Sequence, residues 1–182
     1  MEKLILIKPT GEYANQITEY RREFLDAGDS MDGCGPLRRV ADPEQYLRAC
    51  REYEDVATVP EHLVPATQFI LVREEDGRLL GMLQVRHCFN DYLEKYAGHI
   101  GYSVRPSERR RGYAKKMLAM ALPFCREIGL DRVLICCIDG NIGSEKTILA
   151  NGGVYESTVH EPNENEDLKR FWIDTLQNTK RK

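Results

Sequence analysis

The chain has 182 residues, of which 42% are hydrophobic and 30% charged, and its formal net charge is −3 at pH 7. This length and balance fit one domain with a hydrophobic core, and they exclude a fibrous or intrinsically disordered chain. The short apolar run at residues 4–7 is too brief for a signal peptide or membrane span, so we expect a cytoplasmic protein without a membrane partner. Six cysteines without C-x-x-C spacing indicate free thiols rather than disulfides or a metal site.

The first half of the chain is predicted to contain three strands and two helices. Apolar residues spaced four, three and four positions apart from Tyr13 to Phe24 indicate an amphipathic helix that ends at Gly28. The dipeptide Asp76-Gly77 lies between two apolar runs and is a strong hairpin signal. The expected elements are strands at about 4–7, 67–74 and 79–89, with helices at about 12–27 and 43–53.

The second half continues the alternation of strands and helices. The apolar run at 100–104 is closed by Pro106, which suits a strand entering a turn. Apolar residues then recur with helical spacing over 114–128, where Pro123 is expected to kink the helix. Further strands are expected at 132–138 and around 171–173. The pattern is one strand, a helical section and then alternating strands and helices, which predicts a mixed α/β (α+β) fold.

The segment from Val104 to Lys116 carries the clearest sign of function, because basic residues gather at the start of a helix. The first N–H groups of a helix lack partners within it, and the helix dipole adds positive charge, so a phosphate is a natural ligand. Gly112 is followed by Tyr113, which excludes a Walker phosphate loop, and one glycine is too few for a dinucleotide fingerprint. The basic residues are Arg105, Arg109, Arg110, Arg111, Lys115 and Lys116.

Residues 109–114, R-R-R-G-Y-A, resemble the R/Q-x-x-G-x-G/A motif of the GNAT superfamily of N-acetyltransferases. A buried strand, then Asn141 and Ser144, and then a helix ending at 151–153 follow in the order of the family's second motif. The resemblance extends over 79–156 and implies the acyl-CoA N-acyltransferase fold, a mixed, mostly antiparallel twisted sheet flanked by helices. It also implies one domain over residues 1–182, divided into an acceptor-side section at 1–66, a cofactor-binding core at 67–156 and a C-terminal strand region at 157–182.

The resemblance implies transfer of an acetyl group from acetyl-CoA to a primary amine of a small molecule or peptide, in a ternary complex and without a metal. Main-chain amides of the basic loop would hold the pyrophosphate, Val104 would bond to the pantetheine arm, and Asn141 and Ser144 would line the far wall. Because dimers occur in the family, the resemblance also allows a homodimer. The implied cofactor-binding residues are Val104, Arg109, Arg110, Arg111, Gly112, Tyr113, Ala114, Lys115, Asn141 and Ser144.

The expected acid and base are missing from this chain. Ile148 stands where many members have a tyrosine, and Cys136 stands where many have a glutamate. Tyr102 is a candidate acid and His99 a candidate base, with His87 as a third option, although packed core residues would explain each equally well. A further hypothesis is that no single side chain is essential as the acid, since ordered water and positioning can suffice.

The acceptor is weakly specified. The segment 161–167 carries four acidic residues, which would either steer a cationic amine to the site or form a solvated surface loop. The loop at 28–65 could also cover the acceptor. Two alternative classes of function remain. One is a non-catalytic acyl-CoA-binding or sensor domain, and the other is a nucleic-acid-binding module. The second is disfavoured by the sequence pI of about 5.9 and by the confinement of the basic residues to one loop.

Overall fold

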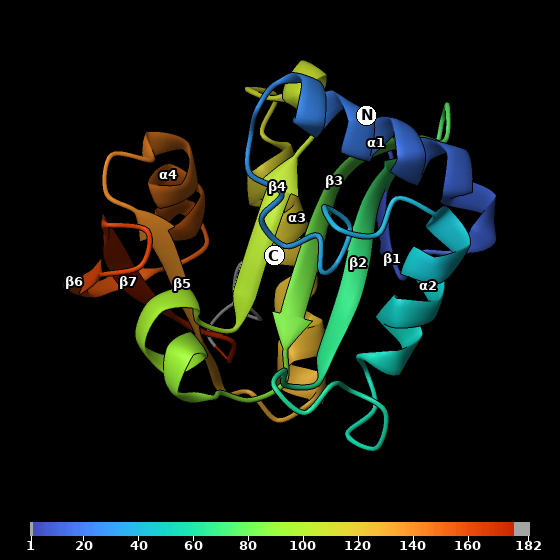
Figure 1. The fold of residues 1–182 in the computed structure, drawn as a ribbon. Helices are drawn as coiled ribbons and strands as arrows, with labels where there is room; N and C mark the ends of the chain where they lie inside the picture. Colours follow the sequence, from blue (N-terminus) through green and yellow to red (C-terminus); the bar gives the residue numbers. More distant parts are fainter. Residues whose placement is uncertain (1, 177–182) are drawn as a thin grey trace.

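The computed structural model describes residues 2–176, which form two antiparallel sheets and four α-helices (Figure 1). No helix in this part of the chain is long and apolar enough to cross a membrane. The strands are β1 (Leu4–Ile7), β2 (Ala66–Arg73), β3 (Arg78–Arg86), β4 (Ile100–Val104), β5 (Arg132–Ile138), β6 (Val154–Glu161) and β7 (Glu166–Asp174). The helices are α1 (Ala14–Asp26), α2 (Pro43–Glu52), α3 (Tyr113–Glu127) and α4 (Ile142–Ala150), with short turns η1 (Gly11–Tyr13), η2 (Leu93–Ala97) and η3 (Pro106–Glu108).

The larger sheet has the strand order β1-β2-β3-β4, and the smaller sheet has the order β5-β7-β6. The expected hairpin at Asp76-Gly77 is confirmed, because β2 and β3 pair with Arg73 opposite Arg78. Gly77 has a φ of +64°, and the Arg73 guanidinium lies 2.7 Å from the Asp76 carboxylate. The fold is therefore the mixed, mostly antiparallel arrangement expected from the sequence, divided into two sheets.

Helices cover both faces of the larger sheet (Figure 1). The apolar side of α1 packs with α2 on one face, where Ile17, Tyr20 and Phe24 are buried as their spacing predicted. On the other face α3 joins the larger sheet to β5 and β7 in a second hydrophobic core. Pro123 does not interrupt α3, which continues as one helix to Glu127.

The two sheets meet at one end of β4. The residues just before this strand make the contact: Gly98 forms an isolated bridge with Ile135, and the His99 N–H donates to the Leu134 carbonyl at 2.7 Å. The Leu134 N–H donates in turn to Nδ1 of His99 at 2.9 Å. Within residues 2–176 no other strand pairing connects β4 with β5, so the two sheets part beyond this bridge.

We expect Gly98→Ala to lower the free energy of unfolding by about 3 kcal/mol. Gly98 has a φ of +70°, and a Cβ there would lie 2.3 Å from the Leu134 carbonyl oxygen. Gly28→Ala is a matched control, because Gly28 has a φ of +62° but nothing within 4 Å of its Cβ position. The control should lose only about 1 kcal/mol. Chemical denaturation measures both values, and equal losses would contradict the proposed role of the close approach.

Candidate functional site

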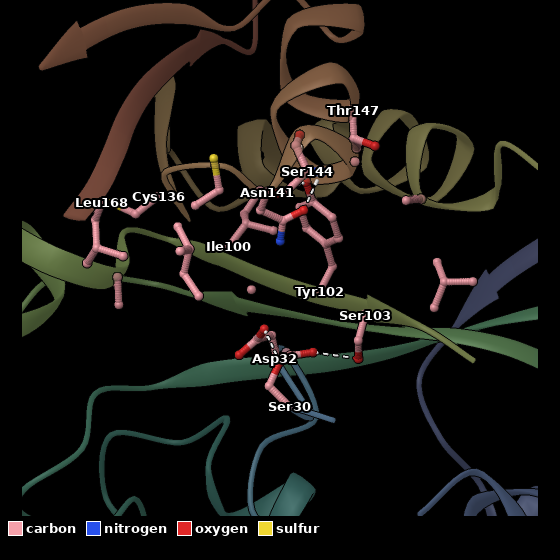
Figure 2. A pocket seen from close by; sticks show the side chains of 18 of the residues that line it. Ser30, Asp32, Ile100, Tyr102, Ser103, Cys136, Asn141, Ser144, Thr147 and Leu168 are labelled. Atoms are coloured by element: carbon pink, nitrogen blue, oxygen red, sulfur yellow. Dashed lines mark hydrogen bonds between the residues drawn. The ribbon is translucent and has the colours of Figure 1, made fainter. Parts of the chain in front are cut away.

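A cavity of about 630 Å³ lies where the two sheets part, within the usual size range of ligand sites. It is lined by β4, β5, the starts of α3 and α4, the loop after α1 and the β6–β7 hairpin. Figure 2 shows Tyr102, Asn141 and Ser144 on one side of β4, and Ser30 and Asp32 on the other. The cavity therefore reaches both faces of the strand.

The loop before α3 turns a row of backbone donors toward this cavity. Arg110 and Gly112 have left-handed φ angles of 68° and 80°, which bend the chain into the start of the helix. Lys116 is the first residue of this stretch whose N–H has a backbone acceptor, the Gly112 carbonyl at 3.2 Å. The six N–H groups of residues 110–115 have no hydrogen-bond acceptor in the described part of the chain. Such a concave set of free donors at a helix start fits a phosphate group.

Three basic side chains add positive charge to this end of the cavity. Arg110, Lys115 and Lys146 line it, are exposed, and form no ion pair within residues 2–176. The sequence analysis did not predict Lys146 as a site residue, although its place in the first turns of the second-motif helix could have indicated it. These three cations and the free amides together would suit an anionic ligand.

The neighbouring arginines have other partners. Arg109 Nε donates to the Val104 carbonyl at 3.0 Å, and its guanidinium lies 2.6 Å from the Asp29 carboxylate. Arg111 is not among the residues that line the cavity, and it pairs with Glu108 at 3.1 Å. Arg109 thus ties the basic loop to the loop after α1, and the Arg111 side chain is engaged by Glu108.

The far wall of the cavity is a hydrogen-bonded chain that ends at a tyrosine. Asn141 caps α4, because its Oδ1 accepts from the Ser144 N–H at 3.0 Å. The Ser144 hydroxyl lies 2.8 Å from the Tyr102 hydroxyl, as Figure 2 shows. Burial raises the pKa of Tyr102 well above its ordinary value, so this hydroxyl remains protonated at neutral pH and can donate a hydrogen bond or proton.

The structure does not bring His99 to the cavity, contrary to the expectation of a catalytic base. Its ring stacks on Phe89 with centroids 3.9 Å apart, and its Nδ1 accepts the Leu134 N–H. Burial lowers the pKa of His99 to about 4, which makes it a weak base. His87 also lies outside the cavity lining and bonds to Thr67 at 2.9 Å. The contacts of both histidines are therefore structural ones within the fold.

The two positions that depart from the family motif have different environments. Ile148 is fully buried in the core that α3 shares with β5, so its side chain does not face the cavity. Cys136 does line the cavity, and burial raises the pKa of its thiol to about 12. The thiol is therefore protonated at neutral pH and does not replace a carboxylate base.

The opposite end of the cavity carries acidic and aromatic residues. Three of the four acids of segment 161–167 line it, while Asp167 pairs with His160 at 2.9 Å instead. Asp32 comes from the loop after α1, and Arg86 is the last residue of β3. The sequence did not indicate Asp32 or Arg86 as site residues, because no local pattern connects a loop and a strand end with a distant hairpin. The residues at this end are Asp32, Arg86, Tyr92, Tyr96, Glu161, Glu164 and Glu166.

Fold and cavity together define a protein that holds a phosphate-bearing ligand at the start of a helix, between two splayed sheets. The model of the acetyltransferase (GNAT) family matches residues 35–150, more than half of the chain. The chain therefore belongs to the GNAT family of acetyltransferases, and it is an acyltransferase that depends on acetyl-CoA. The free amides of residues 110–115 fit the pyrophosphate of that donor.

Solved structures share the fold at low sequence identity. Ribosomal-protein-S5-alanine acetyltransferase from Vibrio fischeri is 16% identical, with a TM-score of 0.71 over 97% of this chain and 96% of its own. A spermidine N-acetyltransferase SpeG chimera from Vibrio cholerae and hSSAT is 16% identical, with a TM-score of 0.65 over 98% and 99%. The protein yncA from Salmonella typhimurium, solved with its cofactor acetyl-CoA, is 13% identical, with a TM-score of 0.64 over 94% of each chain. Among curated protein sequences, no match is found.

We expect Arg110→Gln to weaken acetyl-CoA binding about fivefold, because it removes an exposed charge beside the free amides. Arg111→Gln is the matched control, since Arg111 is not among the residues that line the cavity and its guanidinium pairs with Glu108, and its effect should stay below about twofold. Isothermal titration calorimetry measures both dissociation constants. An equal loss in the two variants would show that only the overall charge of the loop matters.

Proposed function

We propose that this protein transfers the acetyl group of acetyl-CoA directly to a primary amine while both substrates are bound. The observation that carries the proposal is the shape of the cavity, which reaches both faces of β4, with an anion-binding end and a separate acidic end. Donor and acceptor can thus approach from opposite faces. Holding two reactants in one site is itself a large part of catalysis.

Direct transfer is also supported by the state of the two thiols in the cavity. Burial raises the pKa of Cys136 to about 12 and that of Cys137 to about 11. A thiol becomes a good nucleophile only as thiolate, so neither residue is suited to carry the acetyl group at neutral pH. The amine itself would therefore attack the thioester.

The reaction requires one proton donor. The amine nitrogen forms a bond to the thioester carbonyl carbon, the carbon–sulfur bond breaks, and the leaving thiolate takes up a proton. Tyr102 is the proposed donor, because its hydroxyl lines the cavity, stays protonated and is oriented by Ser144. The proton lost by the amine would pass to solvent, since neither His99 nor Cys136 provides a base.

If Tyr102 is the donor, Tyr102→Phe should lower kcat about 100-fold and leave the KM for acetyl-CoA nearly unchanged. Tyr155→Phe is the control, because Tyr155 is exposed and bonds to Thr158 away from the cavity. Steady-state kinetics measure both variants. A loss of less than about tenfold for Tyr102→Phe would instead support the hypothesis that no single side chain is essential as the acid.

The function is tested with acetyl-CoA and a panel of amines, peptides and amino sugars, followed by release of free thiol. Acetylation of any amine in proportion to enzyme supports the proposal. Acetyl-CoA should also raise the unfolding temperature, whereas an oligonucleotide should not. Stabilisation by acetyl-CoA without turnover of any amine would overturn the proposal and favour a non-catalytic sensor domain.

A further inference from the structure

We infer that the acceptor amine also carries an anionic group, a carboxylate or a phosphate, and that Arg86 binds this group. The inference rests on the proposed function, because it concerns the acceptor end of the same cavity. It specifies the acceptor as a small zwitterionic amine rather than a neutral amine or a polyamine.

Arg86 is a partly buried arginine without a carboxylate partner. Its Nη1 donates to the carbonyls of Ala97 at 3.4 Å and Gly98 at 3.1 Å, and it lines the cavity. Its Nε and Nη2 have no hydrogen-bond partner in the described chain, and no carboxylate within residues 2–176 lies within 4.0 Å of its guanidinium. Six other arginines of that region do pair with carboxylates: Arg73, Arg78, Arg105, Arg109, Arg111 and Arg170.

A guanidinium in this setting favours an anionic ligand. Removal from water disfavours its charge and lowers the pKa of Arg86, and the attraction of Asp32, which lies beyond the 4.0 Å of an ion pair, offsets that effect only in part. The free edge of the guanidinium presents N–H donors in a fixed plane, the geometry that matches the two oxygens of a carboxylate or phosphate. A bound anion would therefore complete an interaction that the protein alone leaves open.

The surroundings of Arg86 are held in place. A Cβ on Gly101 would lie 3.4 Å from Nη2, so the glycine leaves room beside the guanidinium. The loop that borders this space is fastened from two strands: the Ser103 hydroxyl donates to the Asp32 carbonyl, and Gln68 Nε2 donates to the Gly33 carbonyl, both at 2.7 Å. An anchor on a rigid frame costs less ordering when the ligand binds.

The same end of the cavity offers carboxylates for the amine. Asp32, Glu164 and Glu166 line the cavity, and none of them forms an ion pair with a lysine or arginine of the described chain. Glu161 also lines it, but its two carboxylate oxygens already accept from Asn163 Nδ2 and from the Glu164 N–H. A polyamine would satisfy these acids but would bring positive charge toward Arg86. A neutral acceptor would pair neither with the carboxylates nor with Arg86. A zwitterion complements both, with its ammonium group toward the carboxylates and its anionic group on Arg86.

The test compares matched acceptors: a series of α-amino acids, the corresponding amino-acid amides, and phosphoethanolamine beside ethanolamine. We expect kcat/KM for the preferred anionic acceptor to exceed that for its neutral partner at least about tenfold. Preference confined to amino acids identifies the group as a carboxylate, and preference confined to phosphoethanolamine identifies it as a phosphate. Either result supports the inference.

The role of Arg86 is then tested by Arg86→Gln, which should lower kcat/KM for the anionic acceptor about 100-fold and change that for the neutral partner less than about threefold. Arg86→Lys should retain an intermediate preference, because it keeps the charge but loses the planar fork. Arg48→Gln is the control, since Arg48 is exposed on α2 and does not line the cavity. Thermal unfolding of each variant detects loss of the contacts of Arg86 with the Ala97 and Gly98 carbonyls.

Failures of the two proposals are distinguishable. If neutral amines are acetylated as well as anionic ones, or if Arg86→Gln lowers kcat/KM equally for both, the inference about Arg86 is overturned while the proposed function stands. If no amine is acetylated, the proposed function fails and the inference falls with it. If Arg86→Gln unfolds, the comparison of matched acceptors on the wild-type enzyme still decides the class of acceptor.

Discussion

The arrangement of this enzyme depends on the single bridge that joins its two sheets. Gly98 and His99 bond to β5 at one end of β4, and beyond that point the described chain contains no pairing between β4 and β5. A side chain at Gly98 would collide with the Leu134 carbonyl, so the bridge requires a glycine. Because the sheets are held at one end and part at the other, a cavity forms that is open to both faces of β4.

The two ends of that cavity are built in different ways. The anion-binding end is local, since the six free N–H groups belong to consecutive residues, 110–115, and their direction follows from one turn and one helix start. The proposed acceptor end is assembled from the loop after α1, the end of β3, the η2 turn and the β6–β7 hairpin. Arg109 connects the two ends, because it pairs with Asp29 in the loop after α1.

Buried polar contacts connect the stability of the fold with the geometry of the acceptor end. The Ser103 hydroxyl, itself buried, lies 3.1 Å from the Tyr20 hydroxyl and 3.3 Å from the Cys34 sulfur, while donating to the Asp32 carbonyl. Unpaired groups at this depth would cost about 1–3 kcal/mol each. The network therefore holds the loop after α1 against β4, and the same contacts that stabilise the core determine where Asp32 lies.

The sequence by itself determined the helical faces, the hairpin, the basic start of α3 and the order of Asn141 and Ser144, because each depends on spacing within one element or on adjacent residues. Only the tertiary structure decided between Tyr102 and His99. Strand alternation puts the two side chains on opposite faces, but which face meets the cavity depends on how β5 and α4 pack against β4. Arg86 escaped notice for the same reason, since the absence of a partner is a property of distant segments brought together.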